Sequence, residues 1–97
     1  MAKIYIAGPM TGLPNFNRDA FRKEAQRLQS IGHATLSSAF LPVGIEPHKR
    51  EAIIYSVDQV VVLPGWESCT QATSDHALAI KLGKPVILTS ILHEEEV

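Results

Sequence analysis

The sequence lacks the features that mark several common protein classes. It has one cysteine in 97 residues, so no disulfide can form within the chain, and a reducing, cytoplasmic setting is expected. No apolar run approaches the roughly 20 residues that a membrane-spanning helix needs. The formal net charge is only −1, which gives no electrostatic reason to expect a nucleic-acid polymer or a membrane surface as a partner.

Motifs for bound cofactors and metals are also missing. The glycines after the first apolar run lack the G-x-G-x-x-G spacing of a dinucleotide site, and the lysine of a P-loop is absent. Cys69 has no base beside it in the sequence and is interpreted as a small helix residue. We therefore expect no cofactor and no metal, because metal-ligand spacing is not shown by the histidines His33, His48, His76 and His93.

What the sequence does contain is a regular alternation of short apolar runs and longer amphipathic segments. Alternation of strands with helices implies a parallel sheet covered on both faces. Right-handed crossovers then favour a flavodoxin-like or Rossmann-like three-layer α-β-α fold with strand order 2-1-3-4. The 97 residues are expected to form one domain, 1–97, with an acidic, solvated tail at about 90–97. Strands are predicted at 3–7, 33–36, 58–63 and 85–89, and helices at 17–31, 48–57 and 68–82.

Capping residues mark where two of the predicted helices begin. Asn17 is placed as the N-cap of the first helix. Ser68, followed three residues later by Gln71, has the pattern of a capping box for the third helix. The 3.6-residue period of the first helix predicts a solvent-facing side that carries Arg22, Lys23, Glu24, Arg27 and Gln29.

Two glycine-bearing loops are predicted to meet at the carboxyl edge of the sheet. One is the segment Gly8, Pro9, Met10, Thr11 and Gly12, and the other is 64–68. In the order 2-1-3-4, strands 1 and 3 are neighbours at the switch point, where open α/β sheets bind ligands. Backbone N–H groups of the first loop and the start of the third helix favour an anionic group such as a phosphate. The alternative is a pair of ordinary βα turns.

Two side chains near this crevice between the two loops are candidates for a role in catalysis or binding. Asp75 lies seven residues after Ser68, which returns nearly to the same face of the helix. It is a nucleophile candidate if that face meets the crevice, and an exposed helix acid if it does not. Trp66 either stacks on a nucleobase at the crevice mouth or packs against a neighbouring loop or a second subunit.

Three segments resemble the nucleoside 2-deoxyribosyltransferase superfamily, and especially a small branch common in bacteriophages and prophages. The resemblance covers nearly the whole chain. It implies a nucleoside or nucleotide substrate, N-glycosidic bond cleavage through a carboxylate nucleophile, and homodimers or larger assemblies whose sites borrow residues from a neighbouring subunit. The segments are Tyr5–Gly12 (YIAGPMTG), Asp58–Ser68 (DQVVVLPGWES) and Ala77–Val86 (ALAIKLGKPV).

The resemblance also assigns roles to residues and exposes three departures. The nucleophilic glutamate of the superfamily falls on Asp75, which is shorter by one methylene, roughly 1.5 Å. An acid that contacts the sugar falls on Arg50, and Gln71 replaces a usual glycine. An altered glycosidase or transferase, an inert nucleotide-binding module and a domain that keeps only the fold all remain open. The substrate-binding candidates are Gly8, Pro9, Met10, Thr11, Gly12, Gly65, Trp66, Ser68 and Gln71.

Overall fold

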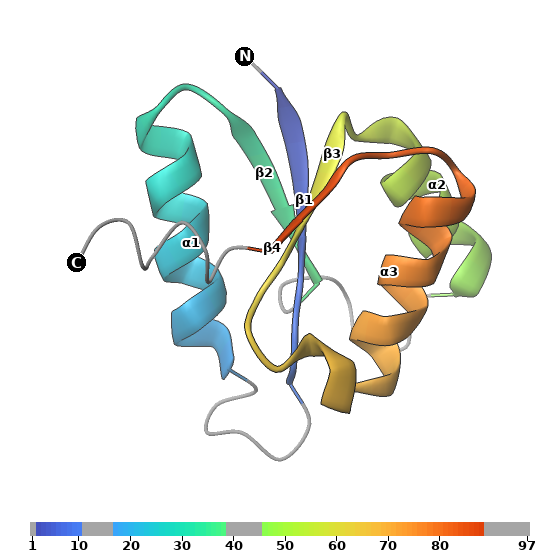
Figure 1. Ribbon diagram of the computed structural model, residues 1–97. Helices are drawn as coiled ribbons and strands as arrows, with labels where there is room; N and C mark the ends of the chain where they lie inside the picture. The colour runs from blue at the N-terminus through green and yellow to red at the C-terminus, as the bar shows by residue number, and fades with distance from the viewer. Residues whose placement is uncertain (1, 11–16, 39–45, 89–97) are drawn as a thin grey trace.

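The structure, a computed structural model, describes residues 2–10, 17–38 and 46–88 of the chain. The predicted acidic tail lies outside these residues. Strands and helices alternate along the chain, as Figure 1 shows. In order, the elements are β1 (Lys3–Ala7), α1 (Arg18–Ser30), β2 (Ala34–Ser37), α2 (Pro47–Ser56), β3 (Gln59–Val62), the short 3₁₀ helix η3 (Trp66–Ser68), α3 (Thr70–Lys81) and β4 (Val86–Leu88).

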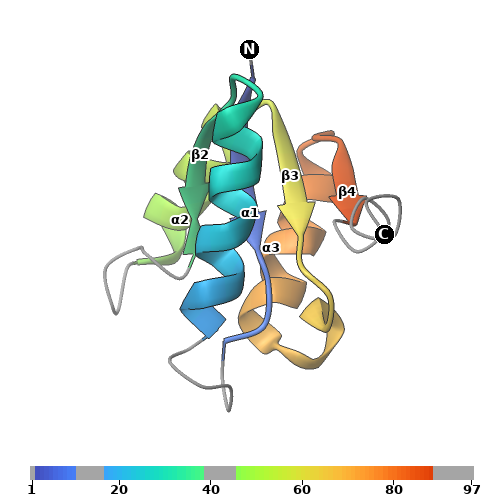
Figure 2. The same ribbon diagram turned by 90° about the vertical axis from the view of Figure 1, so that its left-hand side faces the viewer.

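The four strands form one parallel sheet in the order β2-β1-β3-β4. In the sheet register Ile6 pairs with Ser37 and Ala7 pairs with Val62. Helix α1 covers one face of the sheet, and α2 and α3 cover the other (Figures 1 and 2). The predicted three-layer fold and its strand order are therefore confirmed.

The core is divided by the sheet into two clusters, because successive strand side chains point to opposite faces. On β1, Ile4 and Ile6 face α1 together with Phe21 and Leu28. Tyr5 and Ala7 face the opposite way, toward α2 and α3. This alternation places a buried tyrosine hydroxyl beneath the two helices that close the second face. The second cluster consists of Tyr5, Ala7, Ile54, Val57, Val60, Val62 and Ala79.

The helix starts differ from the predicted capping pattern. Helix α3 begins at Thr70 with Cys69 as its N-cap, so the predicted capping box at Ser68 is wrong. The reason is the turn at Gly65, whose φ of 85° leads into the 3₁₀ helix instead of directly into α3. The Ser68 hydroxyl donates to the Gly65 carbonyl oxygen at 2.8 Å and is used inside that turn. Asn17 does precede α1, but it has a φ of 61° and makes no side-chain cap bond.

One predicted surface residue of α1 is buried instead. Glu24 is fully buried and lies on the same stripe as Phe21 and Leu28. Its carboxylate accepts two hydrogen bonds from Arg27, at 2.9 Å from Nε and 2.6 Å from Nη2. A buried carboxylate is tolerated when a partner charge and hydrogen bonds compensate for lost hydration. The 3.6-residue period does not show that compensation, so the solvent-facing prediction for Glu24 is wrong.

The close approach of β1 and β3 at their carboxyl ends gives a first prediction. A Cβ at Gly8 would lie 2.7 Å from Cβ of Leu63, so we expect Gly8→Ala to lower the free energy of unfolding by about 1–3 kcal/mol. Urea denaturation measures the change.

The matched control is Gly83→Asn. Gly83 has a φ of 74°, and no atom lies within 4 Å of the position that a Cβ would occupy there. Asparagine tolerates this backbone conformation, so a smaller loss of stability is expected. Equal stabilities for Gly8→Ala and the unsubstituted protein would contradict the tight contact at Leu63.

Candidate functional site

The two glycine-bearing loops meet at the carboxyl edge of the sheet, as the strand order requires. The Leu63 amide donates to the Ala7 carbonyl oxygen at 2.8 Å. Beyond this bond, a Cβ at Gly65 would lie 3.5 Å from Cγ of Pro9. Gly8 and Pro9 are buried and Met10 is half-buried. The other two candidates of the first loop, Thr11 and Gly12, lie outside the described residues.

Asp75 faces the sheet and not the solvent. It lies on α3 and is only 1% exposed, so the interpretation of an exposed helix acid is wrong. The Tyr5 hydroxyl of β1 donates to Oδ2 of Asp75 at 3.1 Å. Nη1 of Arg50, from α2, donates to the same hydroxyl oxygen at 2.8 Å and lies 3.7 Å from Oδ2. Three elements therefore contribute one polar side chain each to a buried cluster.

The sequence contains a signal for this burial. In α3 the buried residues are Ala72, Asp75 and Ala79, which follow the i, i+3, i+7 spacing of a helix face packed on a core. The aspartate therefore interrupts a stripe of small apolar residues. No such signal marks Tyr5 or its hydrogen bonds, because an apolar strand with one tyrosine has the pattern of an ordinary core strand.

The two carboxylate oxygens of Asp75 have different surroundings. Oδ2 accepts from Tyr5, whereas Oδ1 is buried, and no donor among the described residues, the nearby Gln71 side chain included, has hydrogen-bond geometry with it. An unpartnered buried polar atom is uncommon in folded proteins and costs about 1–3 kcal/mol. Within the same ranges Ser38 Oγ, one residue beyond the end of β2, is also buried without a partner. Ser38 is not among the predicted site residues.

Burial dominates the ionisation of this cluster. It raises the pKa of Asp75 above the ordinary 3.8, while the Arg50 charge, the Tyr5 hydroxyl and the Gln71 side chain oppose that rise. Burial and the neighbouring carboxylate also raise the pKa of Tyr5 well above its ordinary 10.0. Tyr5 is therefore a neutral hydroxyl at any working pH, and it can donate its proton to Asp75.

The Trp66 ring packs within the chain. It stacks on His76 of α3, with ring centroids 4.2 Å apart and planes inclined by 16°. It also lies against the core cluster beneath α2 and α3. One face of the Trp66 ring is therefore covered by His76 of the same chain. Three other predicted substrate-binding residues lie close to Trp66 in the sequence. Gly65, just before the 3₁₀ helix, and Ser68, at its end, are exposed, and Gln71 in the first turn of α3 is half-buried.

The loop region and the Asp75 cluster are joined by β1. Tyr5 precedes Gly8 by three residues on the same extended segment, a separation of roughly 10 Å along the strand. The Asp75 carboxylate thus contacts the middle residue of β1, and the glycine loop follows the carboxyl end of the same strand. No group of three or more His, Cys, Asp or Glu residues that could hold a metal ion occurs within 2–10, 17–38 and 46–88. In that same part of the chain, no helix is long and apolar enough to cross a membrane.

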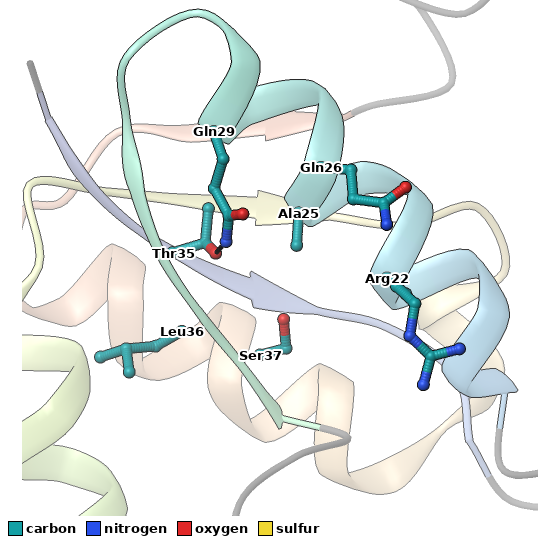
Figure 3. A pocket seen from close by; sticks show the side chains of 7 residues that line it. All are labelled: Arg22, Ala25, Gln26, Gln29, Thr35, Leu36 and Ser37. Atoms are coloured by element: carbon teal, nitrogen blue, oxygen red, sulfur yellow. Dashed lines mark hydrogen bonds between the residues drawn. The ribbon is translucent and has the colours of Figure 1, made fainter.

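A surface pocket of about 390 Å³ lies elsewhere, between α1 and β2 (Figure 3). Gln29 Nε2 donates to Thr35 Oγ1 at 2.7 Å across it. This pocket is on the α1 side, while Asp75 lies under the helices of the opposite face, so the two are separate. The lining residues are Arg22, Ala25, Gln26, Gln29, Thr35, Leu36 and Ser37.

Solved structures of three proteins share the fold. A 2-desoxiribosyltransferase from Leishmania mexicana has a TM-score of 0.70 at 17% identity, covering 91% of this chain and 63% of its own. The CMP N-glycosidase BcmB from Clostridium botulinum has a TM-score of 0.66 at 15% identity, and the match covers 89% of this chain and 66% of the glycosidase chain. A 2-deoxyribosyltransferase from Bacillus psychrosaccharolyticus has a TM-score of 0.60 at 22% identity, and the match covers 90% of this chain and 71% of the transferase chain. The fold is therefore that of the nucleoside 2-deoxyribosyltransferases, and the chain spans less than two thirds of the first of these proteins.

Sequence comparison places the chain more narrowly. No curated protein matches it by sequence. Residues 2–88 match a protein family defined by its sequence pattern, and this match includes all three segments on which the resemblance rests. Because the match covers most of the chain, the protein belongs to the family described as "Domain of unknown function (DUF4406)".

Proposed function

We propose that the protein cleaves the N-glycosidic bond of a nucleoside or nucleotide, as a hydrolase or a deoxyribosyltransferase, with Asp75 as the nucleophile. The observation that carries the proposal is the asymmetry of Asp75, whose Oδ2 is held by Tyr5 while Oδ1 is buried and unpartnered among the described residues. Proteins of this fold include two deoxyribosyltransferases and a CMP N-glycosidase, which supports this class of chemistry.

The substrate in this proposal lies between the loops and Asp75. Backbone amides of the segment Gly8–Gly12 bind the sugar or a 5′-phosphate in this proposal. Trp66 borders the nucleobase with the ring face that His76 does not cover. Gly65, Ser68 and Gln71 complete the substrate-binding set, and Pro9, Met10 and Thr11 belong to the loop.

The proposed reaction has two steps. Oδ1 of Asp75 attacks C1′ of the sugar, so the C1′–O bond forms while the C1′–N bond breaks. The electron pair of that bond stays on the base nitrogen, which takes a proton from solvent. A water oxygen, or the nitrogen of a second base, then attacks C1′, releases the Asp75 carboxylate and gives up one proton.

An inert nucleotide-binding module is the second candidate, and one observation favours it. Nη1 of Arg50 lies 3.7 Å from Oδ2 of Asp75, and a guanidinium charge this close lowers the nucleophilicity of a carboxylate. We also propose a homodimer for either function. Tyr55 on α2 and Ile80 on α3 are exposed large apolar side chains that a second copy would cover.

Release of free base tests the enzymatic proposal. Purified protein at high concentration is incubated with a panel of nucleosides and nucleoside monophosphates, and free base is measured by chromatography. We expect base release from at least one substrate. Asp75→Asn should lower the rate at least about a hundredfold, because the amide is a poor nucleophile at C1′.

The matched control is Asp19→Asn, since the Asp19 side chain is 89% exposed on α1, and its rate should equal that of the unsubstituted protein. Calorimetry with the same panel separates the two candidate functions. Binding without base release supports the inert module, and silence in both assays contradicts both candidates.

The raised pKa of Asp75 gives a pH prediction. Between 3.8 and the higher folded-state pKa, the folded protein binds more protons at this residue than the unfolded chain does. The contribution of Asp75 to the free energy of unfolding therefore falls as pH rises through that interval. Urea denaturation across pH should show this fall in the unsubstituted protein and not in Asp75→Asn, and any activity should be lost on the acid side at a pH above 3.8. Parallel stability profiles for the two proteins would contradict the raised pKa.

A further inference from the structure

Three side chains beneath α2 and α3 form an ordered chain of hydrogen bonds. Arg50 Nη1 donates to Tyr5 Oη at 2.8 Å, and Tyr5 Oη donates to Asp75 Oδ2 at 3.1 Å. The direct separation from Arg50 Nη1 to Oδ2 is longer, 3.7 Å. The Arg50 side chain is only 12% exposed, so little solvent screens this arrangement. Hydrogen bonds therefore connect Arg50 to Asp75 through the tyrosine hydroxyl, whereas the direct Arg50–Asp75 contact is an ion pair longer than a hydrogen bond.

The chemistry of the three groups fixes the direction of this chain. A guanidinium has N–H donors and no acceptor, so in the contact with Arg50 the Tyr5 oxygen accepts. A tyrosine hydroxyl has a single proton, which is left for the other contact. An ionised carboxylate only accepts, and Oδ2 of Asp75 is the oxygen within reach. Arg50 thus sets the orientation of the Tyr5 proton, and that proton selects one carboxylate oxygen.

We propose that Arg50 is a positioning residue which, by donating to Tyr5, directs the Tyr5 proton to Oδ2 of Asp75 and so leaves Oδ1 as the oxygen that attacks. This inference rests on the proposed function for the identity of the attacking atom. The hydrogen-bond chain itself does not depend on any reaction.

Electrostatics favours the same arrangement. The groups that act on the Asp75 carboxylate are Tyr5 from β1, Arg50 from α2 and Gln71 from α3 itself. Each of them lowers the pKa of Asp75 against the rise that burial causes, and the Arg50 charge is the largest of the three. Arg50 therefore helps keep the carboxylate ionised in a buried place.

The test measures the pKa of Asp75 directly. Aspartate labelled with ¹³C at the carboxyl carbon is titrated by NMR, with the signal assigned by its loss in Asp75→Asn. In Arg50→Met, which keeps the apolar stem, we expect the pKa of Asp75 to rise by about one unit or more. Arg50→Lys keeps a donor and a charge, so the pKa of Asp75 in this variant should lie between the values in the unsubstituted protein and in Arg50→Met. Circular dichroism checks folding, and Arg50→Gln replaces Arg50→Met if that variant does not fold.

A double-variant comparison tests the path through tyrosine. If Arg50 acts through Tyr5, the change caused by Arg50→Met should be smaller in a Tyr5→Phe background than in the unsubstituted protein. An equal change in both backgrounds overturns the proposal, and so does an unchanged pKa in Arg50→Met. Arg22→Met, on the opposite face of the sheet, is the matched control and should leave the pKa of Asp75 where it is.

Kinetics separates this proposal from the function on which it rests. Where base release is measurable, Arg50→Met should move the acid limb of the rate to higher pH, by the same amount as the NMR titration, with little change in KM. If no protein, including the unsubstituted one, releases base, the proposed function fails. The pKa comparison then still decides whether Arg50 positions Asp75 through Tyr5.

Discussion

The central position of β1 in the sheet constrains both cores and the candidate site. β1 pairs with β2 on one side and β3 on the other, so it has neighbours on both edges from the two halves of the chain. Its alternation sends Ile4 and Ile6 into one core cluster and Tyr5 into the other. Gly8, the residue after its end, meets Leu63 without space for a Cβ. One strand thus organises both cores, the loop contact and the tyrosine that holds Asp75.

The buried carboxylates Glu24 and Asp75 are compensated in different ways. Glu24 has both oxygens bonded to Arg27, which lies three residues further along α1. Asp75 has one oxygen bonded to Tyr5 and one without a partner in the part of the chain that the structure describes. A fully compensated buried charge has a structural role, whereas a half-compensated one retains capacity to bind or react. This contrast supports the proposal that Asp75, and not Glu24, is the nucleophile.

Arg50 and Asp75 belong to the same buried cluster. Arg50 and Asp75 contact one hydroxyl, so a change at either position alters the electrostatics of the other. The fold alone does not decide between an enzyme and a binding module, because the same scaffold supports many functions. The two proposals differ in the reactivity of the Asp75 carboxylate, whose neighbours are the Arg50 charge and the neutral Tyr5 hydroxyl.

Local pattern and chain connectivity are enough to predict the layers, the strand order and the meeting of the two loops. Strand and helix periods differ, and right-handed crossovers leave few ways to connect them. The predicted bounds of the helices and strands agree with the observed ones within about two residues, because the change of period marks where each element begins and ends. The segment Gly8–Met10 follows directly where the strand period ends.

The side-chain environments, in contrast, depend on tertiary contacts. The turn at Gly65 removes Ser68 from the helix start, and Arg27 allows Glu24 to be buried. The seven-residue spacing relates Asp75 to Ser68 but does not say which face of α3 packs on the sheet. That rotation is set by the apolar stripe of α3 against β1 and β3, which brings residues 70 positions apart, Tyr5 and Asp75, into one hydrogen bond.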